Sequence, residues 1–123
     1  AGAIIGGVLE PVGLRPVIIE DDVFVGGNTG IYEGIIVQSK AVIASGTVIT
    51  ASTPIYDSVQ GRYLNYDSGN SFTIPSAAVV VPGSRRLKSN PEFQVACPII
   101  IKYRDEKTDK AVELEQTLRE LLE

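Results

Sequence analysis

Aliphatic side chains recur at every sixth position through the first half of the chain. The run has seven members: Ile19, Val25, Ile31, Val37, Ile43, Ile49 and Ile55. Small or β-branched residues stand four places after each of the first six: Val23, Thr29, Ile35, Ala41, Thr47 and Thr53. A helix repeats near 3.6 residues and a simple strand at 2, so a period of six fits neither alone. It indicates about four residues of strand followed by two of turn.

Three such six-residue sides close an 18-residue triangular coil. The pattern predicts one coil over residues 19–36 and a second over 37–54, each side pointing one aliphatic residue inward. Stacked coils pair their backbones above and below, and the inward residues stack into a narrow core. The sequence therefore predicts an all-β fold, a parallel β-helix.

The repeat is interrupted, and it then ends. A polar stretch over residues 58–73 predicts a loop that leaves one corner, and the register resumes at Ile74, with Ala78 and Val80, until Pro82-Gly83. We therefore expect a repeat domain over residues 1–83 and a C-terminal cap over 84–123. The cap should hold a strand over Val95–Tyr103 and a helix over Lys110–Glu123. The apolar stripe of that helix comprises Ala111, Leu114, Leu118, Leu121 and Leu122.

Composition excludes several classes of function. The net charge of −4 disfavours nucleic acid binding, and no apolar run is long enough to span a bilayer. There is no signal peptide, and the single Cys97 cannot form an internal disulfide, so we expect a cytoplasmic protein. Without histidine the chain has no imidazole base or imidazole metal ligand, and we expect no metal site. A chain without methionine that begins at Ala1 is expected to be a piece of something longer, or a processed chain.

One segment carries a specific resemblance. Gly6-Gly7-Val8-Leu9-Glu10-Pro11, followed by residues 16–21, resembles the tetrahydrodipicolinate N-acyltransferases of lysine and diaminopimelate biosynthesis, which are hexapeptide-repeat enzymes. The later segments Ile55-Tyr56-Asp57 and Cys97 to Lys102 are similar to the C-terminal half of the succinyl branch. One departure is Gly27-Asn28-Thr29, where the family commonly has Ala-Arg-Ser; it removes a cation.

The resemblance implies a left-handed β-helix and direct transfer of succinyl from succinyl-CoA, the co-substrate, to a small amino-acid substrate, with no tightly bound cofactor. The family's full chain is about twice as long, so this chain would be its C-terminal catalytic part. Two alternatives stay open at this point. One is the N-acetyltransferase branch, and the other is a non-catalytic β-helix that serves as an oligomerisation platform.

Candidate site residues follow from the same resemblance. Glu10 would orient the substrate amine or take its proton, and the alternative is a solvated loop carboxylate. Small residues at the corners would let the pantetheine arm of coenzyme A approach backbone amides; the candidates are Gly26, Gly27, Ser45 and Gly46. Ordinary turn chemistry explains the same residue types.

Basic residues near the end of the chain are candidates for the phosphates of coenzyme A. Lys102, with Arg104 and Lys107, is one such group, and the alternative is a solvated strand end. Arg85, Arg86 and Lys88 share that ambiguity. Cys97 lies in an apolar strand without a histidine to activate it, so we interpret it as a buried, inert thiol.

Outward apolar residues predict self-association. A narrow prism of few coils buries little surface by itself, and it would leave apolar strips exposed. The residues expected to form these strips are Val8, Leu9, Tyr32, Val42 and Val48. Three prisms packed side by side would cover them, and the family resemblance also implies a homotrimer. We expect this fragment to trimerise but to lack acyl transfer.

Overall fold

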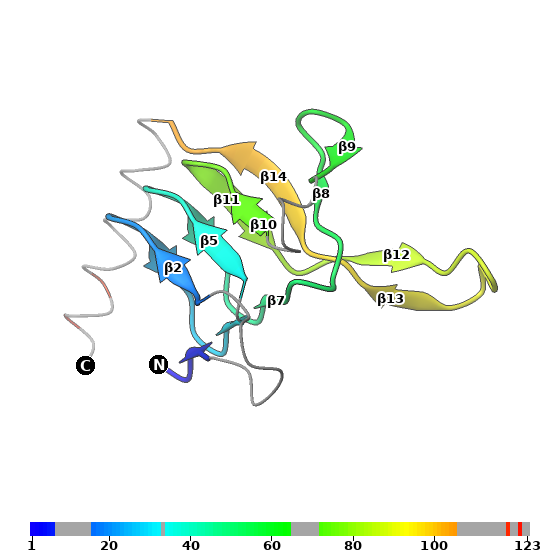
Figure 1. Ribbon diagram of the computed structural model, residues 1–123, viewed down its shortest axis with the longest axis horizontal. Helices are drawn as coiled ribbons and strands as arrows, with labels where there is room; N and C mark the ends of the chain where they lie inside the picture. The colour runs from blue at the N-terminus through cyan, green and yellow to red at the C-terminus, as the bar shows by residue number, and fades with distance from the viewer. Residues whose placement is uncertain (7–15, 33, 65–71, 106–117, 119–120, 122–123) are drawn as a thin grey trace.

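The computed structural model describes residues 1–6, 16–32, 34–64, 72–105, 118 and 121 (Figure 1). Strand and turn account for most of this part of the chain, and within it only Leu118 and Leu121 are helical. The predicted all-β class is therefore confirmed. The helix expected over 110–123 otherwise lies outside the described residues. Among the residues described, no helix has the length and apolar character needed to cross a bilayer.

Three parallel ladders form the sides of the coils. The first contains β1 (Ile4–Ile5), β4 (Gly30–Ile31) and β7 (Val48–Ile49). The second contains β2 (Ile18–Ile19), β5 (Ile35–Val37) and β10 (Phe72–Ile74). The third begins with β3 (Phe24–Val25), β6 (Val42–Ile43) and β11 (Ala78–Val81).

The register of these ladders confirms the 18-residue coil. Ile18 pairs with Ile36, Phe24 with Val42 and Gly30 with Val48, each 18 positions apart. The predicted resumption at Ile74 is also confirmed, because Ile74 pairs with Val37 and Val80 pairs with Ile43.

The continuous six-residue run places Ile55 next to Val37, and that placement is wrong. Ile74 occupies this position, whereas Ile55 is fully buried just before β8 (Tyr56–Asp57). The third sheet continues from β11 through β14 (Ile99–Tyr103) to β8 and then β9 (Arg62–Tyr63). The chain therefore leaves the coil already before residue 58, because β8 pairs with β14 rather than with β5.

The inward aliphatic residues form one core. Fully buried members include Ile31, Val37, Ile43, Ile49, Ile74, Val80 and Ile100. Two threonines lie in the same stack: the Thr29 hydroxyl donates to the Gly26 carbonyl at 2.6 Å, and the Thr47 hydroxyl donates to the Ala44 carbonyl at 2.7 Å. Each buried hydroxyl thereby satisfies its hydrogen bond within its own corner.

At one corner of the coils, a residue in each coil has the left-handed backbone conformation. Asp22, Lys40 and Ala77 have φ values of 60°, 67° and 65° in successive coils. The Lys40 amide donates to the Asp21 carbonyl at 3.0 Å, and the Arg104 amide donates to the Ala77 carbonyl at 2.7 Å. Arg104 Nη1 also donates to the Lys40 carbonyl at 2.9 Å. These bonds give Arg104 a structural role at this corner.

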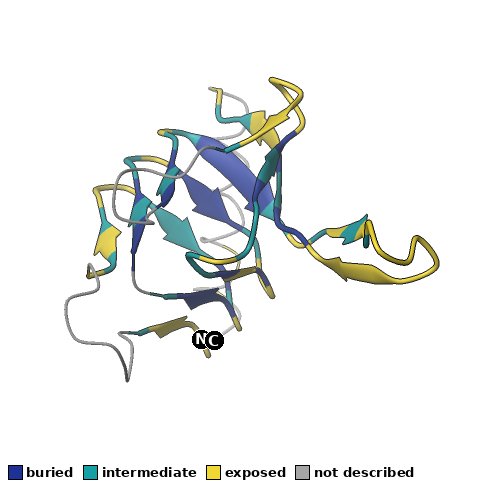
Figure 2. Cartoon of the chain, turned by 45° about the vertical axis from the view of Figure 1, so that its right-hand side comes forward, coloured by how far each residue is buried: buried dark blue, intermediate teal, exposed yellow. Residues whose placement is uncertain are grey.

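A β-hairpin projects from the coils (Figures 1 and 2). It consists of β12 (Ser84–Arg86) and β13 (Gln94–Ala96), which pair antiparallel. The single strand expected over 95–103 is thus two strands, β13 and β14. The two strands separate at Cys97-Pro98 because Pro98 has no N–H to donate to a ladder. The amide of Cys97, the residue before it, donates to the Gly83 carbonyl at 2.9 Å.

The outward apolar residues divide into two groups. Val48 is 52% exposed, as expected, and Tyr32 is partly exposed. Val42 is only 8% exposed, which contradicts its expected place on an exposed strip. It is flanked on the outer face of the third sheet by Phe24 and Val79 in register. Val8 and Leu9 lie outside the described residues.

Candidate functional site

Four of the predicted site residues meet at one corner of the coils. Gly26 and Gly27 follow β3, and Ser45 and Gly46 follow β6, the neighbouring strand. The Gly46 amide donates to the Gly27 carbonyl at 3.0 Å, and the Gly26 amide donates to the Ile43 carbonyl at 2.8 Å. The two turns are therefore stacked directly on each other.

The four residues differ in what they offer a ligand. Gly26 is buried, and a Cβ on it would lie 2.5 Å from the Ser45 amide nitrogen, so close packing of the two coils requires glycine there. Gly46 has a φ of 80°, and a Cβ on it would meet nothing within 4 Å. Ser45 and Gly46 are both exposed. A ligand at this corner can therefore reach the second turn directly.

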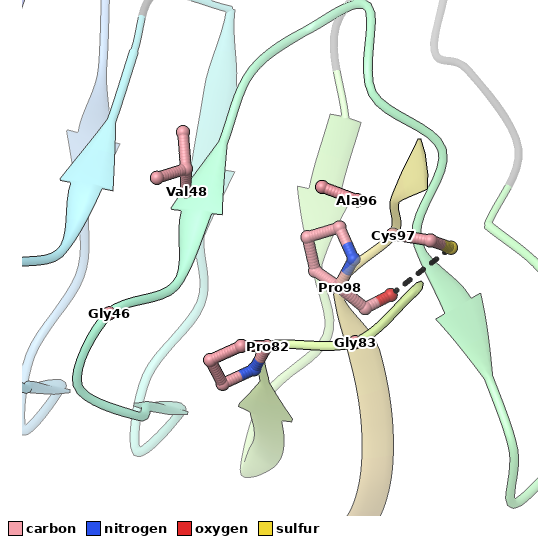
Figure 3. Close-up of a pocket in the computed structure, with 7 residues that line it drawn as sticks. All are labelled: Gly46, Val48, Pro82, Gly83, Ala96, Cys97 and Pro98. Carbon is pink, nitrogen blue, oxygen red and sulfur yellow. Dashed lines mark hydrogen bonds between the residues drawn. The ribbon is translucent and has the colours of Figure 1, made fainter. Parts of the chain in front are cut away.

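A shallow cavity of about 90 Å³ opens beside this corner (Figure 3). The described residues that line it come from three segments and are Gly46, Val48, Pro82, Gly83, Ala96, Cys97 and Pro98. Sequence reasoning found only Gly46 among them. The signal for the others was present in Pro82-Gly83 and Cys97-Pro98, two strand-breaking pairs that the fold brings together at the base of the hairpin.

Cys97 fits the interpretation of an inert thiol. It is 2% exposed, and its Sγ donates to the Pro54 carbonyl at 3.4 Å. Burial raises the pKa of the Cys97 thiol, with a smaller opposing contribution from Arg85. A thiol that stays protonated is a poor nucleophile. In Figure 3 its sulfur is turned away from Gly46 and Val48.

Lys102 lies at the other end of the same sheet. It is exposed on β14 and pairs with Val79, near the start of β11. The cavity residues Pro82 and Gly83 follow the opposite end of β11, where Val81 pairs with Ile99. The structure therefore does not bring Lys102 to the corner formed by Gly26, Gly27, Ser45 and Gly46. Glu10 and Lys107 lie outside the described residues.

Comparison with known proteins shows what the coils are similar to. Residues 16–51 match a family model described as the hexapeptide repeat of succinyl-transferase. This range covers β2 to β7, the part of the chain in which the 18-residue register is regular. The coils are thus similar to hexapeptide repeats of that kind.

Relatives are similar over almost the whole chain. A 2,3,4,5-tetrahydropyridine-2,6-dicarboxylate N-succinyltransferase of Wigglesworthia glossinidia brevipalpis is 43% identical over 95% of this chain, and this chain covers 40% of the relative. An enzyme of the same name from Coxiella burnetii is 43% identical over 97% of this chain, covering 41% of the relative. Protein TabB of Pseudomonas amygdali pv. tabaci is 42% identical over 98% of this chain and 41% of its own length.

These matches confirm the resemblance to tetrahydrodipicolinate N-succinyltransferases, and it extends well beyond the repeats. The chain spans about two-fifths of the length of the curated relatives it matches.

Proposed function

We propose that this chain is part of an N-acyltransferase that moves succinyl from succinyl-CoA to the amine of tetrahydrodipicolinate, in lysine and diaminopimelate biosynthesis. The observation that carries this proposal is the 43% identity over 95% of the chain to an N-succinyltransferase named for that substrate. The exposed turn at Ser45 and Gly46, with its adjoining cavity, supports it.

The proposed reaction is a direct transfer. The substrate is a cyclic imine, and addition of water across its ring C=N bond supplies the amine. The amine nitrogen then attacks the thioester carbonyl carbon, a C–N bond forms, and the C–S bond to coenzyme A breaks. Glu10 accepts the proton that the amine loses, and the departing thiolate is protonated as free coenzyme A. A backbone amide at the corner stabilises the oxyanion that develops on the carbonyl oxygen. The reaction requires no tightly bound cofactor.

The coenzyme A arm would lie along the outside of a left-handed coil, against the corner of Gly26, Gly27, Ser45 and Gly46. The Ser45 hydroxyl and the Gly46 turn are its exposed contacts, while Gly26 serves by allowing the coils to pack closely. Lys102 would reach a coenzyme A phosphate only if the ligand extends toward the start of β11. We place the protein in the cytoplasm, in keeping with the biosynthetic role of its relatives.

We further propose that the site is completed in a homotrimer. Exposed aliphatic residues on the outer faces of the first two ladders support side-by-side packing: Ile4 at 58%, Ile18 at 46% and Val48 at 52%. Sedimentation equilibrium of the 123-residue chain tests this assembly. A stable monomer at micromolar concentration would refute the trimer.

The function is tested by measuring the release of the coenzyme A thiol. The protein assayed is a longer one that contains this chain and has the full length of its relatives. Succinyl-CoA and acetyl-CoA are compared at equal concentration, with tetrahydrodipicolinate as acceptor. We expect a higher kcat/KM with succinyl-CoA than with acetyl-CoA, and we expect the isolated chain to be inactive. Preference for acetyl-CoA would assign the acetyl branch. If the longer protein shows neither turnover nor coenzyme A binding, the remaining function is that of a non-catalytic oligomerisation platform.

A further inference from the structure

A second cavity is lined in part by residues of the hairpin. Its volume is about 350 Å³, within the range of about 300–1,000 Å³ that is usual for small-molecule sites. The described residues that line it are Pro54, Tyr63, Arg85 and Lys88. They come from the segment before β8, from β9, from β12 and from the hairpin turn, so the fold assembles this cavity from two separate stretches of the sequence, residues 54–63 and 85–88.

Arg85 lines this cavity and has a donor without an acceptor among the described residues. Its Nε atom is buried, and no hydrogen-bond partner for it exists in the described structure. A buried guanidinium nitrogen without an acceptor is costly, because water no longer solvates it. An acceptor from a ligand would remove that cost. Nε and a neighbouring Nη of one guanidinium also form the planar fork that binds a carboxylate or a phosphate through two hydrogen bonds.

The other lining residues point to the same chemistry. Lys88 is exposed and adds a second positive charge, and the described lining includes no carboxylate that could neutralise either cation. The Tyr63 hydroxyl can donate to an anion, and its ring is fixed edge-on against Tyr56 with ring centroids 5.0 Å apart. Pro54 supplies an apolar wall. This local concentration of positive charge stands out in a chain whose net charge is −4.

We propose that this cavity binds the anionic group of a small ligand, a phosphate or a carboxylate, through Arg85, Lys88 and Tyr63. The proposal depends only on the cavity and its donors, and it holds whether or not the chain takes part in acyl transfer. The site is separate from the glycine corner: the smaller cavity there shares none of the described residues that line this one.

The test uses the 123-residue chain, two simple probes and the side-chain signals of arginine. Sodium pyrophosphate and sodium succinate are titrated at constant ionic strength, and the arginine Nε–H signals are followed by nuclear magnetic resonance. We expect a saturable shift of the Arg85 Nε–H signal. Stronger binding of pyrophosphate would indicate a phosphate-bearing ligand, and stronger binding of succinate would indicate a carboxylate-bearing one.

Neighbouring residues provide a matched control. Arg85→Gln removes the fork and should weaken binding by about tenfold or more, as expected for loss of a charge-assisted pair of hydrogen bonds. Arg86→Gln removes the same charge from the next, exposed position of β12 and should change the dissociation constant less than about twofold, as surface charge contributes little. Lys88→Ala should weaken binding without affecting the melting temperature, so it tests the site even if Arg85→Gln destabilises the fold.

Three results would overturn the proposal. The first is the absence of saturable binding for both probes. The second is an equal loss of affinity in Arg85→Gln and Arg86→Gln, because that would indicate non-specific charge attraction. The third is an Arg85 Nε–H signal that depends on chain concentration rather than on the added anion, because a second copy of the chain would then fill the cavity.

Discussion

The Tyr103 hydroxyl donates to Asp57 Oδ2 at 2.5 Å, joining residues 46 positions apart. Asp57 is 1% exposed, and its other oxygen, Oδ1, accepts the amides of Val59 and Gln60 at 3.0 and 3.1 Å. One buried carboxylate therefore holds the turn after β8 and the end of β14 together. This contact stabilises the edge of the third sheet where the chain has left the coils.

Removing the Asp57 carboxylate should destabilise the fold. Asp57→Ala leaves two amides and the Tyr103 hydroxyl without their acceptor, and the free energy of unfolding should fall by about 2–4 kcal/mol. Tyr103→Phe removes one hydrogen bond and should cost about 1–2 kcal/mol. Urea denaturation measures both. A loss below about 0.5 kcal/mol in Asp57→Ala would contradict the structural role of this carboxylate.

The same contact predicts a dependence on alkaline pH. Burial and then the hydrogen bond to Asp57 raise the pKa of Tyr103 to about 12 from 10.0. The fold favours the neutral phenol, so this contribution to stability is complete below pH 10 and is lost as the pH rises toward about 12. Absorbance titration of the phenolate should show a late-titrating tyrosine that is lost in Tyr103→Phe. In Asp57→Asn its pKa should fall but stay above 10.0, because burial remains.

A charge in the core of the coils should prevent folding. Ile43 is fully buried, and Ile43→Asp would place an unpaired carboxylate in an aliphatic stack, at a cost comparable to the whole stability of about 5–15 kcal/mol. Circular dichroism and thermal melting measure the outcome. Val59→Asp is the matched control, since Val59 is 55% exposed and should tolerate the charge. Similar melting of the Ile43→Asp variant and the unmodified chain would mean that the inward register is wrong.

The two glycines at the candidate corner should respond differently to a methyl group. Gly26→Ala forces a Cβ against the Ser45 backbone and should cost about 2–3 kcal/mol, with weakened coil packing. Gly46→Ala has free space and only the strain of its positive φ, about 1 kcal/mol. Gly46→Asn should be milder still, because Asn28 adopts φ 56° at the equivalent place one coil earlier. Equal costs for Gly26→Ala and Gly46→Ala would contradict the close approach at Gly26.

Glu10 is tested by an isosteric change. In the longer, active protein, Glu10→Gln keeps the size of the side chain and removes the proton acceptor, so turnover should fall at least about a hundredfold with melting unchanged. Glu10→Asp keeps a carboxylate on a shorter side chain, so its activity should lie between that of Glu10→Gln and that of the unmodified protein. A loss below about fivefold in Glu10→Gln would return Glu10 to the role of a solvated loop carboxylate.

The coils could be predicted from the sequence because each inward side chain depends only on local spacing. Ile31, Ile43 and Ile74 all occupy their predicted places. The exit of the chain before Ile55 could not be predicted in this way. It depends on pairing between β8 and β14, whose residues are more than 40 positions apart, and a period read along the chain contains no information about such a contact.

The candidate site could likewise be predicted only in part from the sequence. The stacking of the two glycine turns follows from the 18-residue period, which sets Gly27 beside Ser45 and Asn28 beside Gly46. The cavity at the hairpin base depends on how β12 and β13 leave the third sheet at Pro82-Gly83 and Cys97-Pro98. Nothing in the local pattern separates Arg85, which lines a cavity, from Arg86, which is exposed one residue later.

The constant offset between coils also determines which insertion lengths this chain can accept without losing its register. Each step from β2 to β5, from β3 to β6 and from β4 to β7 is 18 residues, so an insertion of one whole coil would return every later side chain to its own face. A single-residue insertion there would instead rotate the aliphatic residues out of the core. From Val37 to Ile74 the offset is 37, one more than two coils, because the intervening excursion absorbs the extra residue. Lineages of this protein should therefore vary in length freely between β8 and β10, but only by whole coils between β2 and β7.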